Sequence, residues 1–266
     1  MTDAPAGANV SVRRDGPIAV VEFARPAVAN ALNFDHLHDI EQTALAFRDD
    51  DQTLAVIFTG QGKHFSSGAD LADGGAAHQG SLALRRRRSR IGERAIHALL
   101  DMDQITIAAW NGAAMGGGAC LATAMDFRIG ADDCFMQYPE VDIGLNLMWK
   151  SLPLIVELIG PARAKRLVVG GERVHAQTLL DWGVLDELVP RDELLVTAQA
   201  WAKRYAAKPP IAAQMIKRSI NALSAPLGDA IMHMDTDQNL FAARTEDQKI
   251  AVAAYLNGEP PEFSGN

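Results

Sequence analysis

The stretch from Asn111 to Ala122 constrains the fold of this chain more than any other, and it reads NGAAMGGGACLA. An apolar run at 105–110 precedes it and predicts a short buried strand. Gly116, Gly117 and Gly118 follow, and we expect a helix to begin near Ala119. Glycines at such a turn let a ligand approach bare backbone, where the first N–H groups of the helix have no partners. The turn therefore suits an oxygen that becomes negative during a reaction, although the same cluster also serves as a packing point between strand and helix.

A second loop of similar character lies upstream, at residues 66–70. It follows an apolar run at 54–59, which predicts another buried strand. Each loop can present a free backbone N–H group, and two converging N–H groups form an oxyanion hole. In other enzymes one such donor contributes roughly 3 to 4 kcal/mol of transition-state stabilisation.

The order of elements predicts the fold class. Strand-like runs at 10–14 and 17–23 flank Asp15-Gly16, a strong hairpin signal. Asn33 is a plausible N-cap, and a helix is expected over about 81–102. Because strands alternate with helices and are followed by helices alone, we predict an α/β core at 1–198 and a helical region at 199–266.

Composition excludes several classes of protein. Nearly half of the 266 residues are apolar, yet no run approaches the roughly 18 to 20 residues of a membrane span. The polar N-terminal residues do not resemble a signal peptide. Cys120 and Cys134 are the only cysteines and lack metal-ligand spacing, which predicts a cytoplasmic protein without a metal. A formal charge of −8 disfavours a nucleic-acid surface.

Short motifs found along the chain carry a family resemblance. They occur in one order from about residue 10 to 263, and any one of them alone is a weak signal. The matching pieces are Arg25-Pro26, Asn30-Ala31-Leu32, the run from Phe65 to Leu71, Asn111-Gly112, the three glycines at 116–118, Asp126-Phe127-Arg128, Pro139-Glu140, Ile143-Gly144, Gly160-Pro161 and Thr245-Glu246-Asp247. As an ordered set they resemble the crotonases, the enoyl-CoA hydratase/isomerase superfamily.

The resemblance implies a fold, a substrate and a site. The fold would be a crotonase-like spiral of ββα units, with C-terminal helices joining subunits into homotrimers or dimers of trimers. The backbone N–H groups of Ala69 and Gly117 would hold the thioester oxygen of an acyl-CoA as it becomes an enolate. The surrounding residues would bind the substrate, of which coenzyme A is a part, and no separate cofactor is implied. They are Val28, Ala29, Ser67, Asp70, Leu71, Cys120, Trp149 and Arg88.

The acidic residues are the main departure from the family. Hydratases resembling this chain carry two glutamates, and Glu140 matches the second of them. Cys120 stands at the position of the first. The small Gly-Ala-Gly-Gly run that typically follows the second glutamate is also absent, and a bulky segment containing Trp149 replaces it.

This departure favours one reaction over another. Hydration of a double bond needs a water to be oriented and deprotonated, which two carboxylates do readily. Moving a double bond from C3–C4 to C2–C3 needs only one base. A thiol binds water poorly and is largely neutral at pH 7. We therefore predict an enoyl-CoA isomerase that uses Glu140, with an enoyl-CoA hydratase as the alternative.

Other readings of these residues stay open. Glu140 could be a surface carboxylate, Cys120 an activated thiolate, and Asp142 an assisting acid. Arg88 belongs to an arginine-rich run that is either a solvated face or a contact for an acidic acyl tail or a CoA phosphate. The same run could bind RNA, and the lost glutamate could mark a CoA-thioester-binding subunit without activity.

Overall fold

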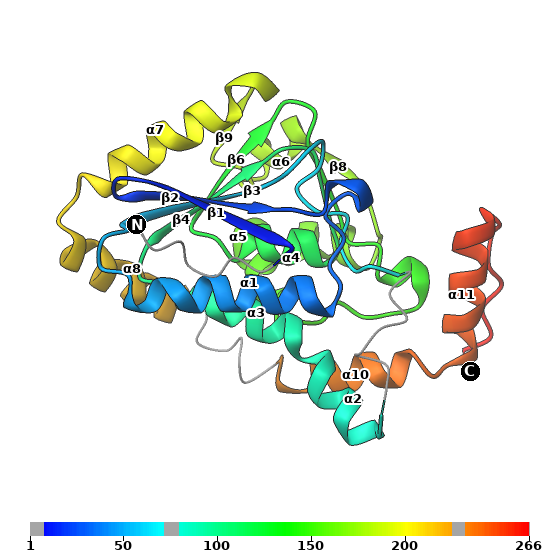
Figure 1. Ribbon diagram of the computed structural model, residues 1–266. Coiled ribbons are helices and arrows are strands. Elements are labelled where there is room, and N and C mark those ends of the chain that lie inside the picture. Colours follow the sequence, from blue (N-terminus) through cyan, green and yellow to red (C-terminus); the bar gives the residue numbers. More distant parts are fainter. Residues whose placement is uncertain (1–7, 72–79, 225–231, 266) are drawn as a thin grey trace.

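The computed structural model describes residues 8–71, 80–224 and 232–265. A six-stranded sheet, ordered β1-β2-β3-β4-β6-β9, forms the centre (Figure 1). A smaller sheet is ordered β5-β7-β8. β1 and β2 pair antiparallel, and the other pairs of the large sheet are parallel. The strands are β1 (Val10–Asp15), β2 (Ile18–Phe23), β3 (Ala55–Gly60), β4 (Ile105–Trp110), β5 (Ala113–Met115), β6 (Phe127–Ala131), β7 (Phe135–Gln137), β8 (Val174–His175) and β9 (Glu187–Val189).

The large sheet is buried on both faces because its central strands β3 and β4 are almost entirely apolar. Successive side chains point to opposite faces. On β2, Val21 and Phe23 enter one core while Ile18 and Val20 enter the other. The predicted hairpin is confirmed, since Gly16 turns β1 into β2 with a φ of 57°.

Helices cover both faces of the sheet (Figure 1). α7 (Leu194–Ala206) packs on β3, β4 and β6, while α1 (Phe34–Ala46) and α3 (Ile91–Leu100) pack together on the opposite side. α1 begins where predicted, because the Asn33 side chain accepts a hydrogen bond from the amide of His36 at 2.9 Å. The turn of the three glycines opens α4 (Gly117–Thr123), whose residues are all buried.

The single helix expected over 81–102 is instead two helices. α2 (Leu82–Ser89) ends and α3 begins at Arg90. Ile91 and Leu99 of α3 are buried, whereas Leu84 of α2 is exposed. The four consecutive arginines of α2 cannot enter the core, so α2 diverges from the sheet and contacts α10 (Asp235–Ala242).

No strand occurs among the described residues of the predicted helical region at 199–266, and two further helices precede that region. α5 (Leu152–Val168) has a kink at Gly160, and α6 (Ala176–Asp181) follows β8. α8 (Pro210–Ser224) and α11 (Glu246–Asn257) complete this part together with α10. None of the helices in the described ranges is long and apolar enough to cross a membrane. The proposed division at 198/199 remains a prediction.

Candidate active site

Two loops meet beside the first turn of α4. Ser66 and Ala114 form an isolated parallel bridge, in which the amide of Met115 donates to the carbonyl oxygen of Ser66 at 3.0 Å. Gly68, with a φ of 85°, lies so close to this strand that a Cβ would be 2.6 Å from the Met115 carbonyl oxygen. The residues that follow Gly68 and Gly116 in the two loops, Ala69 and Gly117, are therefore brought close together.

The amides of Ala69 and Gly117 are free within the described chain. Their neighbours are not, since the amide of Gly116 donates to Gln137 and that of Asp70 donates to Leu32. Ala69 is exposed, which leaves its N–H group accessible. Two unpaired amides on adjacent loops can act as donors to one oxygen.

Glu140 places its carboxylate directly over this turn. It follows β7 and opens the short 3-10 helix Val141–Ile143, and its carbonyl oxygen accepts from the amide of Leu145 at 2.8 Å. A Cβ on Gly116 would lie 2.6 Å from Oε1 of Glu140, so only glycine leaves room for the carboxylate. Oε2 is shielded from solvent and has no hydrogen-bond partner in the described part of the chain.

Burial raises the pKa of Glu140 to about 7, and the nearby charge of Asp142 acts in the same direction. Such a carboxyl is partly ionised near neutrality and can both accept and return a proton. The reading of Glu140 as an ordinary surface carboxylate does not fit the shielded Oε2. Asp142 itself lies toward Gly171, where a Cβ would be 2.8 Å from its Oδ2.

Cys120 lies in α4 beside this carboxylate and is fully buried. Burial raises the pKa of its thiol, the negative charge of Glu140 raises it further, and a hydrogen bond with the Ser151 side chain partly offsets the rise. The thiol is therefore neutral, which argues against an activated thiolate nucleophile. The side chain facing Glu140 thus adds no charge.

Trp149 forms the wall on the other side of the turn. Trp149 and Lys150 both adopt left-handed backbone, with φ of 68° and 56°. The indole fills the space between α3 and α4, because a Cβ on Gly92 would lie 2.0 Å from its Cε2 and one on Gly117 would lie 2.3 Å from its Cζ3.

The residues expected to bind coenzyme A line one exposed rim next to Ala69. Val28 and Leu71 are exposed, and Ala29 has a left-handed backbone whose carbonyl oxygen accepts from the amide of Ser67 at 2.9 Å. Asp70 forms an ion pair with Arg25 at 3.0 Å, so its carboxylate holds this rim in place. Val28, Ala29 and Ser67 thus lie together, and the binding of coenzyme A by this rim remains a prediction.

Arg88 is the predicted site residue that the structure connects least clearly to the others. It lies in α2, half-buried, on a helix that diverges from the sheet. On the same helix, Arg86 forms an ion pair with Asp237 of α10. The arginine run therefore contributes to joining α2 to the C-terminal part.

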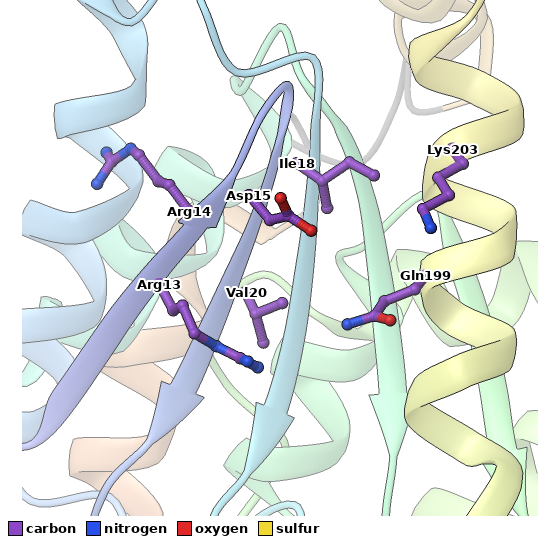
Figure 2. A pocket seen from close by; sticks show the side chains of 7 residues that line it. All are labelled: Arg13, Arg14, Asp15, Ile18, Val20, Gln199 and Lys203. Atoms are coloured by element: carbon purple, nitrogen blue, oxygen red, sulfur yellow. The ribbon is translucent and has the colours of Figure 1, made fainter. Parts of the chain in front are cut away.

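A cavity of about 280 Å³ lies elsewhere, between the β1–β2 hairpin and α7 (Figure 2). Ile18 and Val20 line it from the sheet, and Gln199 and Lys203 line it from α7. It is on the sheet face opposite α4, and no predicted site residue reaches it. Across the described ranges, His, Cys, Asp and Glu side chains form no group of three able to hold a metal.

Comparison with known proteins identifies the family of this chain. Residues 13–266 match the family described as "Enoyl-CoA hydratase/isomerase". The chain belongs to this family. It is 30% identical to the short-chain-enoyl-CoA hydratase of Clostridium acetobutylicum over 93% of this chain and 94% of that protein. It is also 30% identical to the crotonyl-CoA hydratase of Syntrophomonas wolfei, over 96% and 97%.

A solved structure of the same family carries the other activity. The monofunctional enoyl CoA isomerase from M. smegmatis is 29% identical, with a TM-score of 0.70 over 81% of this chain and 93% of that one. The crotonase resemblance, the fold class and an enoyl-CoA hydratase/isomerase-type enzyme are therefore confirmed. The similar proteins include both hydratases and an isomerase, so their names do not decide between hydration and isomerisation. The chemistry of the site has to decide between the two reactions.

Several residues of this hydratase/isomerase site were not anticipated from the sequence. Tyr138 is fully buried beside Cys120 and Glu140, and burial raises the pKa of its hydroxyl. Its position two residues before Glu140 was the only feature of the sequence that could have pointed to it. Asp235, whose Oδ2 accepts from the amide of Lys150 at 2.6 Å, comes from α10 and had no signal at all.

Proposed function

We propose that this enzyme isomerises 3-enoyl-CoA to 2-enoyl-CoA with Glu140 as its single acid–base group. The observation that supports this proposal is that Cys120, beside Glu140, is a buried and neutral thiol. A mechanism with two carboxylates would need a second acid at that position. The pKa of about 7 for Glu140 suits a group that takes up and releases one proton in each turnover.

In the proposed reaction the thioester oxygen accepts hydrogen bonds from the amides of Ala69 and Gly117. The ionised Glu140 removes a proton from C2, and the electron pair of that C–H bond moves toward the carbonyl to form the enolate. The enolate oxygen gains charge where the two amides are fixed. The same carboxyl then returns the proton to C4, the C3–C4 double bond becomes C2–C3, and no water or cofactor is consumed.

Hydration is the second candidate, and the names of the relatives favour it. Addition of water to C3 would use Glu140 as the base, and the water would have to be oriented without a second carboxylate. We expect this reaction to be slow, because a thiol is a poor hydrogen-bond partner for water.

The test compares both reactions on purified protein. We expect turnover of 3-hexenoyl-CoA to the 2-enoyl product, negligible hydration of crotonyl-CoA, and loss of isomerisation by at least about a hundredfold in Glu140→Gln, within the range typical for removing an acid–base group. Asp142→Asn is the matched control and should keep most of the activity. Rapid hydration by the wild-type enzyme would reject the single-base mechanism.

We also propose a trimeric or hexameric assembly of a cytoplasmic enzyme. α8 carries exposed apolar side chains along its outer side, which suits contact with a second copy of the chain. They are Ile211, Met215, Ile216, Ile220 and Leu223. Both cysteines are buried and free, which suits a reducing compartment.

A further inference from the structure

The indole of Trp149 stands at the acyl end of the proposed site. The thioester oxygen would lie about 3 Å from the amide of Gly117, since that is the working distance of such donors. C2 would then be close to Glu140, whose carboxylate touches Gly116. The benzene ring of the same indole presses on Gly117, and its pyrrole edge presses on Gly92 of α3. An acyl chain that continues past C4 therefore meets the indole.

This wall is held from several sides. The amide of Lys150 donates to Asp235, and the Lys150 ammonium lies 3.2 Å from Oε1 of Glu93. Glu93 is buried in α3 and also pairs with Arg90 at 2.8 Å. The Ser151 hydroxyl donates to the carbonyl oxygen of Trp149 at 3.3 Å.

A left-handed backbone is disfavoured for residues with a Cβ and persists only where the surroundings impose it. At Trp149 and Lys150 the imposed conformation turns the indole inward between two glycines, which lack the Cβ atoms that would exclude it. The position of the ring is thus built into three elements of the fold, α3, α4 and α10.

We infer that Trp149 limits the acyl group to a short chain and so determines which enoyl-CoA the enzyme accepts. This inference rests on the proposed function for the location of the thioester. The ring closes the acyl end of the site, and the substrate class is a short, linear enoyl-CoA. Removing the indole opens the space between α3 and α4 to longer chains.

The experiment measures kcat and KM for 3-hexenoyl-CoA and 3-decenoyl-CoA in the wild-type enzyme, Trp149→Phe and Trp149→Ala. The wild-type kcat/KM should be lower for the longer substrate by about tenfold or more, since single methylenes change such ratios by 10- to 200-fold. Trp149→Ala should remove or reverse this preference through a lower KM for 3-decenoyl-CoA. Trp149→Phe, which changes the packing least, should be intermediate and carries the test if the alanine variant does not fold.

Trp201→Phe is the matched control. Trp201 lies in α7 on the opposite face of the sheet, where its Nε1 donates to Glu187 at 2.7 Å, so the chain-length ratio should not change. A wild-type preference for the longer substrate would overturn the inference, as would a parallel loss on both substrates in Trp149→Phe and Trp149→Ala.

Binding separates failure of the inference from failure of the proposed function. If the wild-type enzyme isomerises neither substrate, the proposed reaction is wrong, and calorimetric titration with hexanoyl-CoA and decanoyl-CoA then tests the wall alone. Tighter binding of decanoyl-CoA to Trp149→Ala than to the wild-type protein supports the inference. Equal binding of decanoyl-CoA to both proteins rejects it.

Discussion

In the proposed reaction, Glu140 acts near neutrality as a single carboxyl group. Its pKa is raised first by burial and then by Asp142, and Oε2 has no donor in the described chain to stabilise its ionised form. Ionisation of such a group costs folding free energy, so the property that makes it a useful base also destabilises the protein above neutral pH.

Glu140→Gln should therefore stabilise the protein at high pH. The unfolded pKa is about 4.5 and the folded pKa is about 7, so the native state binds more protons between these values. Wild-type stability falls as pH rises through this window, and the glutamine variant lacks that fall. The variant should gain on the order of 3 kcal/mol relative to wild type between pH 4.5 and pH 8, from 1.36 kcal/mol per pKa unit. Urea denaturation at several pH values measures the difference.

Glu262→Gln is the control for that measurement, because Glu262 is exposed in the C-terminal tail. It should leave the pH dependence unchanged. A difference between Glu140→Gln and wild type that is the same at every pH would show that the effect comes from packing and not from ionisation.

At the scale of elements, the indole of Trp149 packs closely against the first residue of α4. Gly117 has no side chain, and a Cβ there would overlap Trp149 at 2.3 Å and approach Leu32 at 3.1 Å. Alanine is otherwise the better residue in a helix, by roughly 0.5 to 1 kcal/mol. The cost of a side chain at this position therefore depends on the indole.

Gly117→Ala should lower the free energy of unfolding by about 1 to 3 kcal/mol in the wild-type background, as expected for overpacking. In the Trp149→Ala background the same change should be neutral or stabilising. Urea denaturation of the four proteins gives the coupling between the two residues. Equal effects of Gly117→Ala in both backgrounds would mean that the clash is relieved elsewhere.

Local signals predicted most of these elements. Asp15-Gly16 and Asn33 specify a turn and a cap through their own backbone chemistry, and both were predicted correctly. The break at Arg90 was missed because helical periodicity continues through it. Burial of the helical residues begins only at Ile91, and that boundary depends on the rest of the fold.

Within the site, short motifs identified Glu140 and the two glycine-containing loops. The support of Trp149 by Glu93 and Asp235 could not be predicted, because these contacts join segments far apart in the sequence. No local pattern records which distant carboxylate will accept from the amide of Lys150. Contacts between such distant residues form only when the helices and strands that carry them pack together.

For the whole molecule, α8 combines a buried anchor with an exposed apolar side. The Lys217 ammonium lies 2.7 Å from both the Gln104 carbonyl oxygen and Asp126 Oδ2, which fixes the helix beneath the sheet. Ile216 and Ile220 remain 60% and 57% exposed on the outer side. A helix held by a buried charge can present such side chains to another subunit without reorganising.

Replacing both Ile216 and Ile220 by Glu should dissociate the assembly, because charges would be buried in an apolar contact. Sedimentation velocity should then show a monomer where the wild-type protein sediments as a trimer or hexamer. Val196→Glu is the control, since Val196 is similarly exposed, at 68%, on α7. A wild-type monomer would contradict the proposed assembly.

The hydrogen bond from Lys150 to Asp235 has a consequence for synthesis of the protein. Asp235 follows Lys150 by 85 residues, so the ribosome releases Ala69, Gly117 and Glu140 well before the residue that fixes Trp149. The chemical groups emerge first and the end wall of the acyl site is completed last.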